Sequence, residues 1–172
     1  MRIALLYGST TGTTERIARR LRDMLGLPID TFANVHELEA DDLAGHDLII
    51  AGVPTWYMGE LQDDWDTLCP GLCRVDLSAS RVAVFGAGDQ SGYPDHFQDA
   101  MGRLLDAFVA HGARPGLGST STEGYAFEGS LAVREGRFCG LAIDEVNQPE
   151  LTEARIRAWC SQLRRELGQA KV

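Results

Sequence analysis

Hydrophobic and polar residues follow two patterns that alternate along the chain. Short, nearly continuous apolar runs are typical of parallel strands that are covered on both faces. Such runs occur at residues 3–7, 47–53, 81–85 and 140–143, with a candidate edge strand at 28–32. Between them, apolar residues three and four positions apart predict helices over 13–25, 35–44, 61–68 and 95–111. The repeated strand–helix order predicts an α/β fold with a parallel sheet between helices.

A last helix is expected to start near Thr152, which is a plausible N-cap. Its apolar stripe contains Ile156, Trp159, Cys160 and Leu163. Because Cys160 falls on this stripe, we expect it to be a small core residue.

Residues 112–139 break the alternation. They are rich in Gly, Ser, Thr and Glu and carry no helical stripe. A segment of this length without structure is unusual in a compact domain. We therefore expect an inserted loop or small hairpin that interrupts the final strand. There are no internal repeats and no linker, so the expectation is a single domain over 1–172.

The loop at residues 8–14 follows the first predicted strand and precedes the first predicted helix. It contains two glycines and five hydroxyl side chains and reads GSTTGTT. A helix N-terminus leaves backbone N–H groups unpaired and binds phosphate readily. The loop lacks the lysine of a P-loop and the G-x-G-x-x-G pattern of a dinucleotide site. It favours a neutral cradle for a phosphate monoester, whereas plain helix capping would need only one hydroxyl.

Two further loops follow neighbouring strands and carry aromatic residues. Trp56 and Tyr57 lie in residues 54–60, and Tyr93 lies in the glycine-rich residues 86–94. In open α/β sheets, ligands bind beyond the carboxyl ends of the strands. Each loop taken alone also fits a self-packed lid or an ordinary turn. Together they predict a phosphate site beside aromatic faces for a flat ring.

Charge and composition narrow the possible partners. The formal net charge is −9, from 25 acidic and 16 basic residues. Such a chain is expected to avoid nucleic acid and anionic membranes and to be attracted to basic protein surfaces. No apolar run reaches the roughly 20 residues of a membrane span, and the start of the chain does not fit a signal peptide. The four cysteines are expected to be reduced structural thiols, without a metal site, in a cytoplasmic protein.

Four stretches of the chain resemble the long-chain bacterial flavodoxins. They read GSTTGTTERIA, PTWYMGELQDDW, GAGDQSGYPDHFQDAMG and FCGLAIDEVNQPELTEARIRAW. The likeness covers almost the whole chain and implies a flavodoxin-like, doubly wound, five-stranded parallel sheet of order 2-1-3-4-5. Helices would cover both faces, and the 112–139 insertion would split the last strand. It also implies noncovalently bound FMN and low-potential one-electron transport rather than enzymatic catalysis.

The resemblance further implies which residues contact FMN. In the first loop, the phosphate cradle would be Ser9, Thr10, Thr11, Gly12, Thr13 and Thr14. The second loop would supply Pro54, Thr55, Trp56, Tyr57, Met58 and Gly59, with Trp56 stacked on one ring face. The third would supply Ala87, Gly88, Asp89 and Tyr93, with Tyr93 on the outer face and weaker contacts from His96 and Gln98. Many relatives carry an acid and an Asn or Lys at the positions of Thr10 and Thr13.

Two features should set the redox behaviour. In this family a flip of the peptide equivalent to Tyr57-Met58 stabilises the neutral semiquinone. Tyr57 is not glycine, so a positive φ there would be strained and the stabilisation smaller. A group of acids is expected near the ring, where they would disfavour the second electron. They are Glu60, Asp63, Asp64, Asp66, Asp89 and Asp95, and a solvated helix start explains Asp63, Asp64 and Asp66 equally well.

Two other functions are weighed against electron transport. An FMN-dependent NAD(P)H:quinone reductase could use the same scaffold, but the chain has no pyridine-nucleotide fingerprint. A phosphoacceptor signalling domain would need an acidic pair where this chain has Gly8-Ser9. The family's partners include an NADPH-dependent flavodoxin reductase and acceptors such as nitrogenase, radical enzymes and P450 systems. A monomer is the default expectation.

Overall fold

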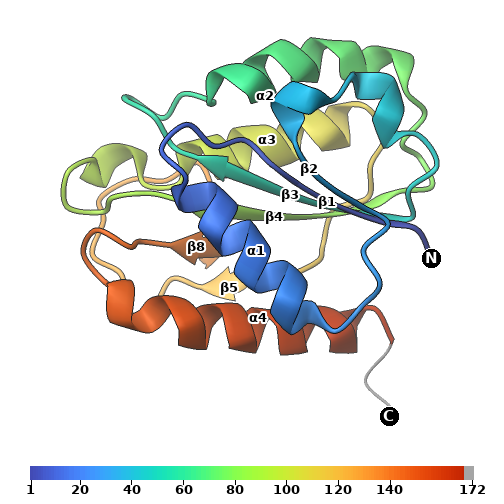
Figure 1. Ribbon diagram of the computed structural model, residues 1–172. Coiled ribbons are helices and arrows are strands. Elements are labelled where there is room, and N and C mark those ends of the chain that lie inside the picture. The colour runs from blue at the N-terminus through green and yellow to red at the C-terminus, as the bar shows by residue number, and fades with distance from the viewer. Residues whose placement is uncertain (169–172) are drawn as a thin grey trace.

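A computed structural model describes residues 1–168 and is built around a parallel sheet. Its five strands are β1 (Ile3–Tyr7), β2 (Thr31–Asn34), β3 (Leu48–Pro54), β4 (Arg81–Ala87) and β8 (Leu141–Ile143). They lie in the order β2-β1-β3-β4-β8, and every neighbouring pair is parallel. The predicted order is confirmed, with β8 as the fifth strand (Figure 1).

Helices cover both faces of the sheet. The face below it in Figure 1 carries α1 (Thr13–Leu25) and α4 (Thr152–Glu166), and the opposite face carries α2 (Asp63–Leu68) and α3 (Asp99–Ala110). The bounds of α1 are those expected from its apolar spacing. Short 3-10 helices fill the connections: η1 (Val35–Glu37), η2 (Ala40–Leu43), η3 (Cys69–Arg74), η4 (Pro94–His96) and η5 (Pro149–Leu151).

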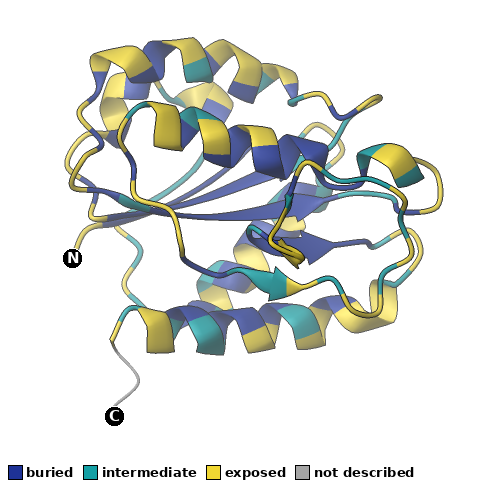
Figure 2. Ribbon diagram, turned by 180° about the vertical axis from the view of Figure 1, so that it is seen from behind, coloured by how far each residue is buried: buried dark blue, intermediate teal, exposed yellow. Residues whose placement is uncertain are grey.

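The sheet separates two hydrophobic cores. Along β1, Ile3 and Leu5 point to the α1–α4 side, whereas Ala4 and Leu6 point to the α2–α3 side. All four are buried, which explains why the strand is a continuous apolar run rather than an alternating one. Figure 2 shows the central strands buried along their length and the helices exposed on their outer sides.

Residues 112–139 form the predicted insertion. It contains β5 (Thr120–Ser121), β6 (Val133–Arg134) and β7 (Arg137–Phe138), which make a small antiparallel sheet of order β5-β7-β6. Near the start of this segment, Arg114 forms a parallel bridge with Arg81 at the start of β4. After it, β8 pairs with the other end of β4. The last strand is therefore split in two, as the resemblance implied.

Some predicted elements need correction. Residues 35–44 form η1 and η2 rather than one helix, because Asn34 and Asp42 bind nearby backbone amides with their side chains. The edge strand starts at Thr31, not at residue 28. The predicted helix 95–111 is interrupted at Gln98, where φ is 62°.

The start of the last helix also differs from the prediction. Thr152 is the first residue of α4 rather than its N-cap, because η5 runs directly into the helix. Its hydroxyl is buried without a hydrogen-bond partner among the described residues.

Within residues 1–168, no helix has both the length and the apolar character needed to cross a membrane. The domain prediction of 1–172 includes residues 169–172, which lie outside the described part of the chain.

Candidate functional site

The loops that follow β1, β3, β4 and β8 gather at the carboxyl edge of the sheet (Figure 1, left). They enclose a cleft of about 520 Å³. Half of the predicted site residues line it: Thr11, Thr13, Pro54, Thr55, Trp56, Ala87, Gly88, Asp89 and Tyr93. Five lining residues were not predicted: Arg16, Arg20, Glu145, Val146 and Pro149. The cleft thus joins all three predicted loops with a fourth, which follows β8.

The phosphate loop, residues 8–14, leads into α1 without capping it. Gly12 holds the N-cap position at φ 88°, and no side chain of the loop caps the helix. Ser9 Oγ accepts a hydrogen bond from the Gly12 amide at 3.1 Å, and the buried Thr14 hydroxyl has no partner among the described residues. The first amides of α1 are therefore available to a ligand. This geometry rules out simple capping as the role of the hydroxyls and fits an anion.

Gln62 supports the phosphate loop by a hydrogen bond from the start of α2. It is buried at the start of α2, and its amide group donates to Thr10 Oγ1 at 3.4 Å and to Asp64 Oδ2 at 2.6 Å. No motif or periodicity pointed to this residue, because the contact spans 52 positions.

The fifties loop, residues 54–60, contains a tight turn. Trp56 and Glu60 exchange backbone hydrogen bonds at 3.2 and 2.8 Å. Trp56 lines the cleft, whereas Tyr57 and Met58 are exposed at its rim, 66% and 70% respectively. Tyr57 adopts φ 43°, so the positive φ that the sequence analysis treated as strained is the conformation present.

The nineties loop, residues 86–94, is held by side chains. The Asp89 carboxylate accepts from the amides of Ser91 and Gly92 and from Asn147 Nδ2 at 2.8 to 3.1 Å. These bonds, above all the one from the Gly92 amide, lower the pKa of Asp89. Tyr93 follows the turn and is 49% exposed at the cleft.

Asp144 joins the nineties loop to the end of β8. It is fully buried and accepts hydrogen bonds from the amide and side chain of Gln90 at 3.0 and 2.8 Å. It also accepts from the Val146 amide and from both nitrogens of Asn147, at 2.8 to 3.1 Å. Gln90 Oε1 accepts in turn from the Ala126 amide at 2.6 Å. The insertion therefore braces the nineties loop through Gln90.

His96 and Gln98 are not part of the cleft wall. His96 Nδ1 lies 3.0 Å from Asp99 Oδ2. Gln98 is fully buried and donates to the Ile143 carbonyl at 3.0 Å. A Cβ on Gly86 would collide with the Gln98 side chain, and one on Gly88 would lie 3.1 Å from it. The absence of a side chain at Gly86 and Gly88 therefore makes room for Gln98, and Gly88 also lines the cleft.

The rest of the predicted site residues are near the cleft without lining it. They are Ser9, Thr10, Gly12 and Thr14 in the phosphate loop, and Tyr57, Met58 and Gly59 in the fifties loop. Gly59 packs against Asp99, since a Cβ there would lie 2.5 Å from its Oδ2.

The charge of the cradle also needs correction. Arg16 and Arg20 line the cleft, so its wall is not neutral. Both form salt bridges with Glu145, at 3.1 and 3.4 Å. The prediction of a neutral cradle concerned the loop at residues 8–14, whereas these arginines lie one and two turns into α1.

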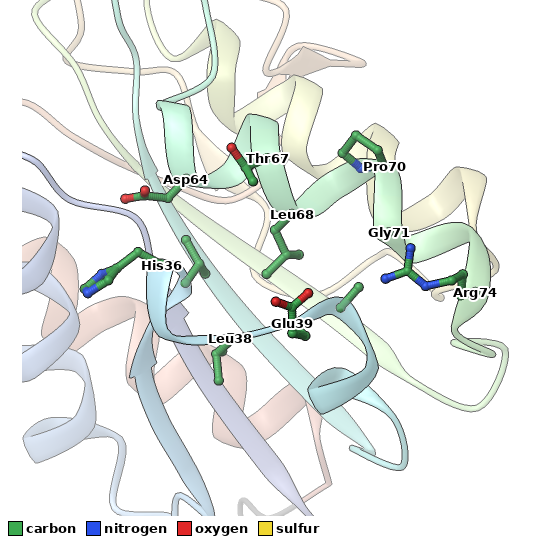
Figure 3. A pocket seen from close by; sticks show the side chains of 11 residues that line it. His36, Leu38, Glu39, Asp64, Thr67, Leu68, Pro70, Gly71 and Arg74 are labelled. Atoms are coloured by element: carbon green, nitrogen blue, oxygen red, sulfur yellow. The ribbon is translucent and has the colours of Figure 1, made fainter.

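Asp64 was expected near the ring but lines a different pocket (Figure 3). This second pocket, of about 420 Å³, lies between the η1–η2 segment and the α2–η3 segment. Its labelled polar residues are His36, Glu39, Asp64, Thr67 and Arg74. No aromatic ring other than that of His36 lines it, so it does not suit a flat ligand.

All four cysteines are free thiols, and Cys160 is buried in the core as predicted. Burial raises the pKa of Cys69 to about 12 and that of Cys139 to about 11. Within the described part of the chain, no group of three or more potential ligands could hold a metal ion.

A doubly wound sheet with an uncapped helix N-terminus and two aromatic side chains in one cleft defines an α/β protein that binds a flat, phosphorylated ligand. The profile of the family described as "Flavodoxin" matches residues 5–159. The chain is 46% identical over 167 residues to a flavodoxin of Nostoc sp., covering 97% of this chain and 98% of that one. It is 42% identical over 171 residues to the flavodoxin of Haemophilus influenzae, covering 99% and 98%.

A solved structure gives the same result. The crystal structure of Fusobacterium nucleatum flavodoxin bound to flavin mononucleotide superposes with a TM-score of 0.89 at 30% identity, covering 96% of this chain and 98% of that one. The chain belongs to the flavodoxin family.

Proposed function

We propose that the cleft binds FMN noncovalently and that the protein carries single electrons between redox proteins. It is an electron-transfer protein rather than an enzyme. The observation that carries the proposal is that an uncapped helix N-terminus, at Gly12, opens into the same cleft as Trp56 and Tyr93. A phosphate and a flat ring are the two ends of FMN.

The chain's own groups fit these two ends. The amides at the start of α1 and the hydroxyls of Thr11 and Thr13 would hold the phosphate. Trp56 and Tyr93 come from different loops and would cover the ring. Bound FMN supplies the one-electron chemistry.

The surrounding residues tune that chemistry. Trp56 and Tyr93 exclude water from the ring and so strengthen every charge interaction at the site. The Asp89 carboxylate lines the cleft and disfavours added negative charge there. The carbonyl of the peptide between Tyr57 and Met58 would accept a hydrogen bond from an N–H group of the ring, beside Tyr57, which is already held at a strained positive φ.

The expected partners are proteins with basic surfaces. The net charge of −9 favours encounters with such surfaces at low ionic strength. An NADPH-dependent flavodoxin reductase would be the donor, and nitrogenase or radical enzymes are candidate acceptors. We also propose that the protein works as a cytoplasmic monomer. Size-exclusion chromatography and cell fractionation test these two points.

The direct test is the absorption spectrum of the purified protein, followed by titration of the apoprotein with FMN. We expect a yellow protein, and apoprotein that quenches FMN fluorescence at a ratio of one to one. A colourless protein whose apoform leaves FMN fluorescence unchanged would end the proposal.

A second experiment separates a carrier from an NAD(P)H:quinone reductase on the same fold. The flavin-loaded protein is mixed with NADPH in a stopped-flow instrument, with and without a flavodoxin reductase. A carrier is reduced only when the reductase is present, and reduction slows as ionic strength rises. Rapid reduction by NADPH alone would identify an enzyme instead.

A further inference from the structure

An ion-pair cluster bridges α1 and the loop after β8 across the cleft. Glu145 Oε2 lies 3.1 Å from Arg16 Nη2, and Glu145 Oε1 lies 3.4 Å from Arg20 Nη1. The two arginines lie on adjacent turns of α1, whereas Glu145 is 129 positions away from Arg16 in the chain. All three residues line the cleft.

The guanidinium of Arg16 lies at the edge of the phosphate loop. Its Nη2 donates to Thr13 Oγ1 at 3.3 Å. Its Nη1 lies 3.7 Å from the point that a Cβ on Gly12 would occupy. Arg16 is therefore beside the uncapped amides of α1, where an anion is already favoured.

We propose that Arg16 is a binding residue for the phosphate of the cofactor and that Glu145 competes with the phosphate for this guanidinium. The inference rests on the proposed binding of FMN. It assigns a charged residue to a cradle whose loop is otherwise neutral, and it makes Glu145 a residue that lowers affinity.

The relative strength of the two interactions decides the direction. The Arg16 side chain is 55% exposed and that of Glu145 is 18% exposed, so water screens the ion pair from the Arg16 side and weakens it. An arginine–phosphate contact is a charge-assisted hydrogen bond, and it is reinforced here by the helix N-terminus. The Arg16 guanidinium should therefore bind the phosphate in preference to the Glu145 carboxylate.

Removing Glu145 should have the opposite effect to removing Arg16. The Glu145 carboxylate places a negative charge on the cleft wall and occupies two guanidinium groups. A neutral residue at this position removes the repulsion and releases both arginines. Arg16 keeps its place on α1 through Thr13, so its position does not depend on Glu145 alone.

The test compares FMN with riboflavin, which lacks the phosphate, by fluorescence titration of apoprotein. For R16Q we expect the Kd for FMN to rise at least about tenfold and that for riboflavin to change by less than about twofold. For E145Q we expect the Kd for FMN to fall about threefold, with no change for riboflavin. In the double variant, the effect of E145Q should be smaller than in the wild type.

Matched controls separate this from general charge effects. R22Q removes the same charge from the far end of α1, where Arg22 pairs with Asp23, and E153Q removes a carboxylate that pairs with Arg157. Neither should change the ratio of the two Kd values by more than about twofold. Circular dichroism confirms that each variant is folded.

The outcomes are distinct. Wild-type apoprotein that binds neither flavin would overturn the proposed function and this inference with it. Wild-type binding of FMN with equal losses for FMN and riboflavin in R16Q would overturn the inference alone. Weaker FMN binding in E145Q would show that Glu145 supports the site, and would also overturn it.

Discussion

The phosphate loop and the nineties loop face the same cleft but are built in different ways. The phosphate loop depends mainly on its own residues: Gly12 takes a left-handed conformation, and Ser9 Oγ accepts from the Gly12 amide three positions away. A distant side chain, Gln62, adds one hydrogen bond to Thr10 at 3.4 Å. The nineties loop depends on distant residues, because Gln90 binds Asp144 and Ala126, which are 54 and 36 positions away. One loop is largely a local structure, and the other is an assembly of three chain segments: the loop itself, the insertion and the residues after β8.

This difference assigns separate tasks to the two loops. A local loop at a helix start presents amides to a phosphate and needs little support from the rest of the molecule. A loop that covers a ring must hold a large side chain, Tyr93, at a fixed place, and the buried Asp144 network supplies that rigidity. Damage to the first loop should therefore affect phosphate recognition, and damage to the second should affect ring binding.

The largest effect is expected for D144A. Asp144 accepts five hydrogen bonds in a buried site. Its removal takes the acceptor from the amide and side chain of Gln90 and from the amides of Val146 and Asn147. We expect the free energy of unfolding to fall by about 3 kcal/mol. Affinity for FMN and for riboflavin should fall together. Urea unfolding and fluorescence titration of apoprotein measure the two effects.

The control for D144A is D23A, which truncates an exposed aspartate on α1 that pairs with Arg22. It should leave unfolding and both affinities close to the wild type. If D144A weakened FMN binding and spared riboflavin, the division of tasks between the two loops would be wrong.

Next in size is G12A, which strains the phosphate loop. Gly12 has φ 88°, and a left-handed conformation costs an L-residue roughly 1–2 kcal/mol. We expect that loss of stability and a rise in the Kd for FMN, with riboflavin binding unchanged. The measurements are those used for D144A.

A second glycine provides the matched control. Gly136 has φ 76° in the insertion, and a Cβ there would meet no neighbour within 4 Å. G136A should lose similar stability and bind both flavins normally. A matching change of flavin affinity in G136A would mean that backbone strain, wherever it lies, is what weakens binding.

The same contrast explains what could be predicted from the sequence. The glycines and hydroxyls of residues 8–14 are adjacent in the chain, so their role could be inferred, and the helix that follows has its predicted bounds. The salt bridges of Glu145 and the hydrogen bonds of Asp144 join residues far apart, and no periodicity encodes them. The resemblance implied a weak cofactor contact for Gln98, but this residue has φ 62° and its side chain is buried.

Local competition accounts for the errors in secondary structure. The apolar spacing of residues 35–44 suits a helix, yet the Asp42 side chain binds the Glu39 amide and closes a short 3-10 turn instead. Such hydrogen bonds join residues that are close in the chain and form without ordering distant segments. They therefore compete successfully with a helix whose apolar stripe is weak.

A substitution in the fifties loop tests whether a local turn can be stabilised without changes elsewhere in the chain. Tyr57 holds φ 43°, which a glycine adopts without strain. We expect Y57G to be about 1 kcal/mol more stable and to have a higher first reduction potential, since the turn can then rearrange at less cost. Urea unfolding and a spectroelectrochemical titration measure the two changes. M58G is the control, because Met58 has no positive φ, and it should not gain stability.

The smallest effect is a pH dependence that belongs to the nineties loop. Hydrogen bonds from the Gly92 amide, Asn147 and the Ser91 amide lower the pKa of Asp89 below its value in the unfolded chain. Asp89 therefore stabilises the fold above the unfolded pKa of about 4, and this contribution disappears as the pH falls through the lower, folded pKa. Because the group is partly exposed, we expect less than about 1 kcal/mol.

Comparison of the wild type with D89N isolates this contribution. Asparagine keeps an oxygen that can accept from the Ser91 and Gly92 amides, so the turn should survive and only the charge is lost. The variant should unfold at lower urea than the wild type at pH 7, and the gap should close near pH 2. N147A removes one donor to the carboxylate. In the N147A background, D89N should therefore lower the urea midpoint at pH 7 by less than it does in the wild type. If D89N were destabilised by the same amount at pH 7 and at pH 2, the shape of the Asp89 side chain rather than its charge would stabilise this loop. The loop would then depend less on the charged contact with Asn147 than its hydrogen bonds indicate.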